Sequence, residues 1–359
     1  MTLQFTRGVP ALDMMPAELL AQSSHAAMQQ YAAMALPYGA TMGFLPLREW
    51  LAQHHDCRVE QVIVGNGSIN LIAHWAHSFL SPGDTVIVES PTYDRALTLF
   101  QEAGAQIIAL PLLDDGIDPA VLEAQIISHK PRLIYLIADF NNPSGVTTSA
   151  AKREAIATIA QRHDVLIIED GAYHQLRYLG EPIPQLRHYA PDNVLSTGSF
   201  SKLLAPGLRT GWMILPPQLV DGFVAHLQNM YITPNQYAQA TVMAAVTTDA
   251  YVQQLARLHD TYRQRLQVAH QALEQYLKPL GTHWAEPEGG FFFGVTVPPT
   301  KQPIWDISPA YGLALVNGDG FFHDRTNTNF VRVPFCSLNE ADLEEGIERL
   351  GQVVRENLA

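Results

Sequence analysis

The chain has few cysteines and few basic residues, and both shortages exclude classes of protein. Cys57 and Cys336 are its only cysteines and lie far apart, so we expect no disulfide framework and no cysteine zinc site, and a reducing compartment fits. Lysine and arginine together number 22 against 35 acidic residues, giving a net charge of −13. Because the chain is acidic and has no basic cluster, we expect no nucleic-acid binding.

Long hydrophobic runs are also missing. The longest apolar stretches, such as residues 133–138, are far shorter than a membrane span, and the N-terminus lacks the apolar core of a signal peptide. Of the 359 residues, 47% are hydrophobic, which is ample core for one large domain or two modest ones. We therefore expect a cytoplasmic protein that binds no membrane.

Short apolar runs alternate with helix-like segments through the first half of the chain. The runs are almost continuously hydrophobic, as in strands buried on both faces of a parallel sheet. This repetition predicts a doubly wound α/β domain with a mostly parallel sheet. We expect strands at residues 61–65, 85–89, 106–110, 133–139 and 165–170, with helices at 68–80, 93–103, 119–128 and 149–163.

After residue 212 the pattern changes to longer helices with isolated short strands, which predicts a smaller α+β domain. We place the large domain at residues 38–248 and assign residues 1–37 together with 249–359 to the small one. The later elements are expected as helices at 217–230, 237–247, 251–276, 309–315 and from about 339, and as strands at 290–297 and 330–334.

Residues 194–212, VLSTGSFSKLLAPGLRTGW, hold a pattern suited to binding a phosphate. A short apolar run breaks at Gly198, Ser199 and Lys202 follow, and Arg209 comes shortly after a Pro-Gly turn. Cations and hydroxyls at a strand end suit a phosphate. A lysine leaving a buried strand can also be partly desolvated, which lowers its pKa and makes its amine a nucleophile. By itself, the stretch is equally consistent with an ordinary surface loop.

Other polar residues follow apolar runs, at the strand ends where open α/β sheets bind ligands. Gly67 and Ser68 lead into a helix, so free backbone N–H groups and the helix dipole form an anion cradle there. Asn142 lies in a turn fixed by Pro and Gly. Asp170 ends a buried strand, where a carboxylate needs a partner such as a protonated ring nitrogen. A plain turn and a helix cap remain the alternative interpretations of these last two residues.

Arg332 lies in the middle of an apolar strand near the end of the chain. An arginine at such a position usually pairs with a carboxylate in a bidentate manner. No acid adjoins it in the sequence, so its partner is either a distant protein carboxylate or a substrate acid.

Taken in order, these motifs resemble those of the fold-type I pyridoxal-phosphate (PLP) enzymes, and among them the class I/II aminotransferases. The segments YLIADFNNPSG, IIEDGAYHQLRY and GSFSKLLAPGLRTGW are most similar to the branch of 2-aminoadipate aminotransferases and MocR regulators. The resemblance covers roughly residues 5–350. It departs at Gly171, where an acid is usual, and at Asn141 and Ser144, where Gln and Thr are usual.

The resemblance implies a PLP-dependent aminotransferase that moves the α-amino group of an amino acid to a 2-oxo acid by ping-pong chemistry. Lys202 would form a Schiff base with the cofactor, Asp170 would keep its pyridine nitrogen protonated, and Tyr173 would complete the catalytic set. The implied cofactor contacts are Tyr38, Gly67, Ser68, Tyr93, Asn142, Asp170, Tyr173, Ser199, Lys202 and Arg209.

The resemblance also implies a substrate site and a partner. Arg332 would clamp the substrate α-carboxylate, with Asn142 and Gly8 beside it. Tyr38 is similar to the family tyrosine that reaches the phosphate of the partner subunit, so a homodimer with shared active sites is implied. No metal is expected.

Two other functions stay open at this point. One is a lyase, cyclase or decarboxylase that acts on an amino acid with the same cofactor. The other is a ligand-sensing domain, as in MocR regulators. We disfavour the sensor because no DNA-binding motif precedes residue 5 and because Lys202, Asp170 and Arg332 are all present.

Overall fold

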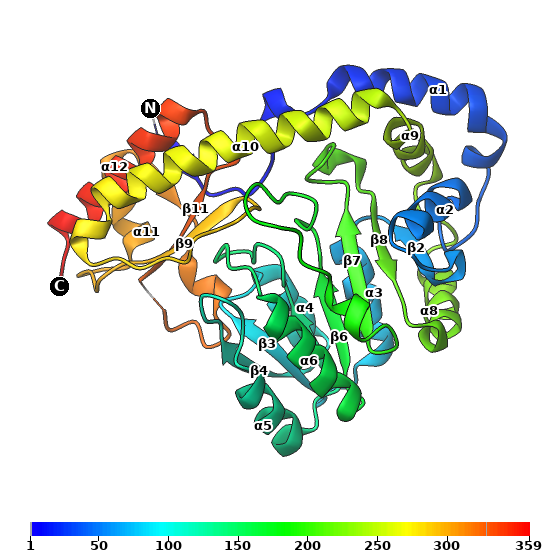
Figure 1. Ribbon diagram of the computed structural model, residues 1–359, viewed down its shortest axis with the longest axis horizontal. Helices are drawn as coiled ribbons and strands as arrows, with labels where there is room; N and C mark the ends of the chain where they lie inside the picture. The colour runs from blue at the N-terminus through cyan, green and yellow to red at the C-terminus, as the bar shows by residue number, and fades with distance from the viewer. Residues whose placement is uncertain (1, 328) are drawn as a thin grey trace.

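A mixed central sheet forms the middle of the molecule in the computed structural model, which describes residues 2–327 and 329–359 (Figure 1). Every neighbouring pair of strands runs parallel except those that involve β8, which is antiparallel to both β2 and β7. In sheet order the strands are β2 (Val62–Gly65), β8 (Gly211–Ile214), β7 (Val194–Ser199), β6 (Leu166–Asp170), β5 (Leu133–Leu136), β3 (Thr85–Ser90) and β4 (Gln106–Pro111).

Helices cover both faces of this sheet, because successive strand residues point to opposite sides. Val86 and Val88 pack with one set of helices, whereas Ile87 between them packs with the other. The first set is α3 (Ser68–Phe79), α4 (Asp94–Glu102) and α8 (Pro217–Met230), and the second is α5 (Pro119–His129), α6 (Ala150–Arg162) and α7 (Leu186–Tyr189). The predicted doubly wound α/β arrangement is confirmed.

The remaining elements pack beside the sheet. The long helix α10 (Asp249–Tyr276) runs from α9 (Gln236–Val246) to α12 (Glu340–Glu356), close to both chain ends (Figure 1). Helix α1 (Ala17–Ala35) packs along α9, which also contacts α2 (Leu45–His54). Two small sheets pair β9 (Phe292–Thr296) with β11 (Phe330–Pro334) and β1 (Leu3–Phe5) with β10 (Leu313–Leu315). The division into domains stays a prediction.

Two expectations about local structure need correction. The helix expected near residues 309–315 is wrong: a 3-10 turn at Ser308–Tyr311 ends at Gly312, whose φ is +69°, and β10 follows. Its leucines pair with β1, so tertiary pairing decides the conformation there. The sequence also gave no sign of β8, a strand of four residues that inserts between β7 and β2.

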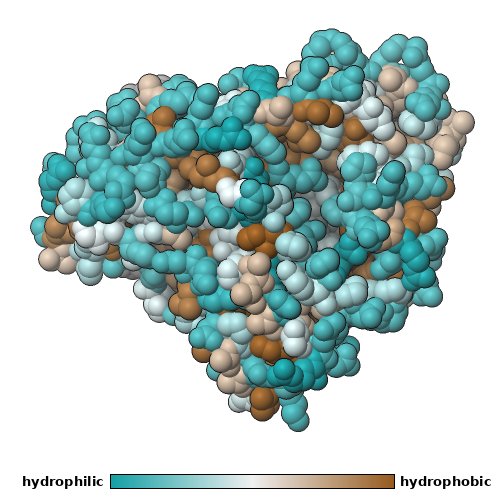
Figure 2. Space-filling view, in the orientation of Figure 1, coloured by the Kyte–Doolittle hydropathy of each residue, from teal (hydrophilic) through white to brown (hydrophobic). Residues whose placement is uncertain are grey.

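Hydrophilic side chains cover most of the face shown in Figure 2, and the hydrophobic ones gather only in small groups. In the part of the chain that the structure describes, no helix combines the length and the hydrophobicity that crossing a membrane requires.

Gly198 sets the distance between two strands behind the site, and its substitution should destabilise the fold. A Cβ atom at Gly198 would lie 2.2 Å from Cζ2 of Trp212 on the paired strand β8. We expect Gly198→Ala to lower the free energy of unfolding by about 1–3 kcal/mol through overpacking, measured by urea unfolding followed by circular dichroism.

The matched control is Gly222→Ala on α8, where the nearest atom, Phe79 Cζ, lies at 3.9 Å. Alanine is the better helix former, so this variant should be neutral or gain up to about 1 kcal/mol. Equal stabilities of the two variants would contradict the packing account.

Candidate active site

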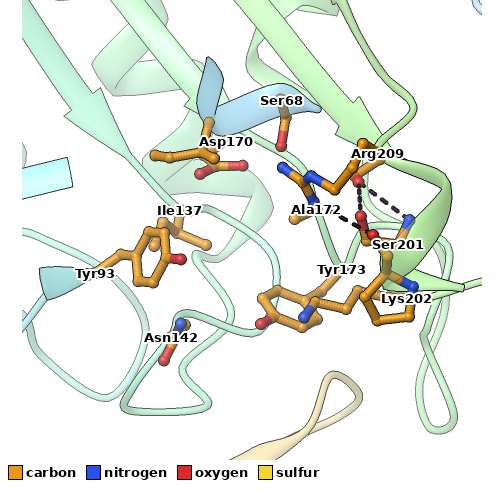
Figure 3. Close-up of a pocket in the computed structure, with 13 residues that line it drawn as sticks. Ser68, Tyr93, Ile137, Asn142, Asp170, Ala172, Tyr173, Ser201, Lys202 and Arg209 are labelled. Atoms are coloured by element: carbon orange, nitrogen blue, oxygen red, sulfur yellow. Dashed lines mark hydrogen bonds between the residues drawn. The ribbon is translucent and has the colours of Figure 1, made fainter. Parts of the chain in front are cut away.

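The carboxyl ends of the parallel strands meet at one edge of the sheet and bring the predicted residues together. Asp170 is the last residue of β6 and Ser199 the last of β7, while Ser68 begins the helix that follows β2 and Tyr93 directly precedes the helix that follows β3. A pocket with about 670 Å³ of open space lies there (Figure 3). The predicted residues that line it are Ser68, Tyr93, Asn142, Asp170, Tyr173, Ser199, Lys202 and Arg209.

The other predicted residues lie near this pocket or away from it. Gly8 touches the site through its backbone carbonyl, which accepts a hydrogen bond from Lys202 Nζ at 2.8 Å. Gly67 precedes Ser68 at the start of α3. Arg332 is not among the lining residues but donates to the side chain of Asn142. Tyr38 lies outside the pocket and is 79% exposed.

One end of the pocket is an anion cradle. Gly67 has a φ of +104°, and a Cβ atom there would lie 2.5 Å from Nη2 of Arg209, so only glycine lets the guanidinium approach. Ser68 at the N-terminus of α3 and the hydroxyl of Ser201 face the same space (Figure 3). Ser199 also lines the pocket, and its hydroxyl lies 2.9 Å from that of Ser201. Within the described residues no carboxylate pairs with Arg209; the guanidinium donates only to backbone carbonyls.

Lys202 offers a reactive amine in the pocket. Burial lowers its pKa, with positive charge from Arg332 and Arg209 acting in the same direction and the negative charge of Asp170 opposing them. Its Nζ lies 5.8 Å from the ring centre of Tyr173 and 5.9 Å from that of Phe291. The one hydrogen bond that this amine makes in the described structure is to the neutral carbonyl of Gly8, so it is held in place without a counter-ion.

Asp170 is a buried carboxylate, and each of its oxygens accepts a hydrogen bond from a hydroxyl group. Tyr135 donates to Oδ2 at 2.8 Å and Thr197 to Oδ1 at 3.2 Å. Burial raises the pKa of Asp170, and these hydrogen bonds oppose that rise. The sequence analysis missed both donors. Thr197 could have been found because it lies two residues before Ser199, but Tyr135 sits inside an apolar run and shows no such signal.

The tyrosines beside these groups stay protonated. Burial raises the pKa of Tyr93 to about 12 and that of Tyr173 well above its usual value. Tyr173 therefore keeps a hydroxyl proton to donate, and Tyr93 presents a neutral ring on the opposite side of the pocket (Figure 3).

Arg332 is clamped between two aromatic rings. Its guanidinium carbon lies 4.6 Å from the ring centre of Phe292 and 4.9 Å from that of Phe321. Nη1 donates to Oδ1 of Asn142 at 2.9 Å and Nη2 to the carbonyl of Thr6 at 3.1 Å. Burial lowers its pKa, yet a guanidinium remains charged in proteins. Its Nε is buried and has no hydrogen-bond partner in the described residues.

These residues fit pyridoxal phosphate. The cradle at Gly67 and Arg209 suits a phosphate, and the buried Asp170 lacks a cation, which a protonated ring nitrogen would supply. Lys202 offers the amine, and the neutral hydroxyl of Tyr173 suits a ring oxygen.

Comparison with known proteins places the chain among enzymes. The family model for aminotransferase class I and II matches residues 3–350. The aromatic-amino-acid aminotransferase 1 of Thermococcus litoralis is 31% identical, over 98% of this chain and 87% of that protein. The 2-aminoadipate transaminase of Thermus thermophilus is 28% identical, over 99% of this chain and 91% of that protein.

Solved structures agree with these relatives. The kynurenine aminotransferase of Pyrococcus horikoshii, in complex with PMP, superposes with a TM-score of 0.94 at 31% identity, over 99% of this chain and 91% of that one. The predicted fold type, cofactor and transamination activity are thereby confirmed.

Lys202 should be the residue that pyridoxal phosphate modifies. Because its amine lines the pocket and burial lowers its pKa, we expect borohydride reduction of the holoenzyme, followed by peptide mapping, to label Lys202. The Lys202→Ala variant should lose the label.

Lys152→Ala is the control, since Lys152 is engaged by Asp115 at 2.6 Å away from the pocket. It should be labelled at Lys202 like the unmodified protein. A label on another lysine in either variant would disprove the assignment.

Proposed function

The chain belongs to the class I and II aminotransferase family, and from this membership we propose which residues carry out its reaction. Its activity is PLP-dependent transamination of amino acids. The observation that supports the assignment best is the convergence of Lys202, Asp170 and Arg209 on one pocket from separate strand ends. We assign the cofactor phosphate to Gly67, Ser68, Ser199 and Arg209, the ring nitrogen to Asp170, the ring oxygen to Asn142 and Tyr173, and the ring face to Tyr93.

Lys202 holds the cofactor and then moves protons. When bound, pyridoxal phosphate supplies an electron sink that makes the α-proton of an amino acid acidic. Burial favours the neutral form of the Lys202 amine. Its Nζ can therefore take up the α-proton as a general base and later release it as a general acid. In the free protein the carbonyl of Gly8 accepts a hydrogen bond from Nζ and so fixes the position of the amine at the pocket.

Arg332 binds the α-carboxylate of the amino acid and of the 2-oxo acid that accepts the amino group. The support is its geometry: the two rings fix the plane of the guanidinium, and Nε has no partner. A substrate carboxylate can accept one hydrogen bond from Nε and a second from Nη2, where it replaces the carbonyl of Thr6. The two hydrogen bonds form a bidentate pair. Asn142, held by Nη1, completes the substrate contacts.

The active form is a homodimer in which Tyr38 reaches the phosphate of the partner subunit. Tyr38 cannot serve its own site, because it lies outside the pocket and is 79% exposed. Leu36, Ile232 and Tyr237 are also exposed and line or adjoin the hollow beside it. Apolar side chains gathered on a surface are typical of an interface.

The domain division and the compartment are also proposals. We divide the chain into a PLP-binding domain of residues 38–248 and a small domain of residues 1–37 and 249–359. Under this division β6, which carries Asp170, belongs to the PLP-binding domain, and β11, which carries Arg332, belongs to the small domain. We propose the cytoplasm as the compartment, because Cys57 and Cys336 are both free.

Replacing Arg332 should weaken catalysis with amino acids. Losing two hydrogen bonds between charged groups, at about 1.5–3 kcal/mol each, should lower kcat/KM by roughly 10²–10⁴-fold in Arg332→Ala. Arg332→Lys should recover only part of this loss, because an ammonium cannot copy the planar fork.

Affinity for pyridoxal phosphate should change by less than about tenfold in both variants, since Arg332 lies outside the predicted cofactor contacts. A near-normal kcat/KM in Arg332→Ala, or loss of the cofactor instead, would rule out the carboxylate role.

Hybrid dimers should reveal shared sites. We expect Tyr38→Phe to weaken cofactor binding and Lys202→Ala to abolish activity. A mixed dimer of the two variants contains one site with neither change, so mixing should restore up to half of the normal activity at limiting cofactor.

Unmixed variants of each kind serve as controls. A fully active monomer by light scattering, or no recovery in dimers shown to be mixed, would exclude the composite site.

A further inference from the structure

The carboxylate of Asp170 accepts hydrogen bonds from side chains on both of the strands that flank β6. β6 lies between β5 and β7. From β5 the hydroxyl of Tyr135 reaches Oδ2, and from β7 the hydroxyl of Thr197 reaches Oδ1. Thr197 is directly opposite Asp170, whereas Tyr135 is opposite Ile168, two residues earlier. The long side chain of Tyr135 spans this diagonal to reach Asp170.

Tyr135 cannot act on a ligand directly. Its side chain is fully buried and is not part of the pocket lining. The ring packs edge-on against Phe100 of α4, with ring centres 5.5 Å apart. The tyrosine is therefore held in place by packing, and its hydroxyl group points at a single acceptor.

The two hydroxyls have a consequence for charge. Hydrogen bonds donated to a carboxylate favour its ionised form, while burial favours the neutral acid. Asp170 has no cationic partner within ion-pair distance in the described residues. A backbone hydrogen bond from Ala172 also favours the ionised form. Without the two hydroxyls, the balance would shift toward a neutral acid, which gives a protonated ring nitrogen no charge to pair with.

We propose that Tyr135 and Thr197 are positioning residues that fix both oxygens of Asp170 and keep its carboxylate ionised for a protonated ring nitrogen of the cofactor. This inference rests on the role proposed above for Asp170. It adds two residues that never touch the cofactor but set how strongly the protein can hold the charged form of its ring.

Cofactor binding to the apoprotein tests the proposal without any turnover. We expect Tyr135→Phe, which removes one oxygen and keeps the packing on Phe100, to weaken binding of pyridoxal phosphate by roughly 10- to 100-fold, the effect of a hydrogen bond to a charged group. Binding is measured by fluorescence titration. Deazapyridoxal phosphate, which has carbon in place of the ring nitrogen, should bind equally well to the variant and to the unmodified protein.

Variants at Thr197 give a second, independent test, which remains available if Tyr135→Phe fails to fold. Thr197→Val should show the same selective loss, and Thr197→Ser, which restores a hydroxyl, should recover it. Tyr251→Phe is the control for removing a buried hydroxyl, because the Tyr251 hydroxyl is buried, lies on α10 and has no partner in the described chain. It should leave both affinities unchanged.

The outcomes separate the possible errors. Equal losses for the two ligands would overturn the proposal and leave Tyr135 a packing residue, as would unchanged binding of pyridoxal phosphate. Asp170→Asn tests the underlying role: if the unmodified protein and this variant both fail to distinguish the two ligands, Asp170 does not pair with the ring nitrogen. A selective loss in Tyr135→Phe that is absent in the Asp170→Asn background supports the proposal.

Discussion

The free energy of keeping charges away from water constrains this active site more than any other factor. Asp170 and Arg332 are buried and Lys202 is partly buried, and among residues 2–327 and 329–359 none of them has an ion-pair partner. Each is held instead by neutral groups: two hydroxyls and a backbone N–H for Asp170, a carbonyl for Lys202, and an amide and a carbonyl for Arg332. Neutral dipoles stabilise a charge without cancelling it. Burial favours the neutral form of the Lys202 amine, so only Asp170 and Arg332 need an opposite charge. In the proposed assignment the cofactor and the substrate bring that charge, which converts the cost of burial into affinity for them.

The fold delivers these groups from distant parts of the chain. The sheet supplies the proposed cofactor residues, because parallel strands end at one edge. The carbonyls come from the N-terminal segment: Thr6 accepts from Arg332 and Gly8 from Lys202. That segment is anchored by β1, which pairs with β10, and a Cβ atom at Gly8 would meet the ring of Phe292 at 2.1 Å. The same ring lies against Arg332. The proposed substrate and cofactor residues are therefore linked through the neutral backbone carbonyls of one short segment.

The sequence predicted the parts of the site that come from local motifs. Asp170, Ser199 and Lys202 end or follow apolar runs, so their meeting at one sheet edge follows from the order of strands and helices. What the sequence could not provide depends on pairing across long distances. Tyr135 looks like any core residue until its neighbour on β6 is known, and β8 is too short to stand out without its partners. The leucines at 313 and 315 suit a helix or a strand, and only β1 decides between them. Tyr38 is exposed in a single chain, so its predicted role depends on a second one.

The three departures from the family pattern lie in the layer that supports the site, and the structure gives each a physical account. A Cβ atom at Gly171 would lie 2.6 Å from the carbonyl of Thr197, so the usual acid would not fit this backbone without a shift. Asn141 and Ser144 hydrogen-bond to each other at 2.9 Å, and Asn141 also donates to the buried Glu89. Burial raises the pKa of Glu89 to about 8. These contacts hold the turn in which Asn142 lies, so a different set of residues supports the same position. The departures therefore change how the site is braced, and Gly171 removes an acid beside it, while Asp170, Lys202 and Arg332 keep their positions.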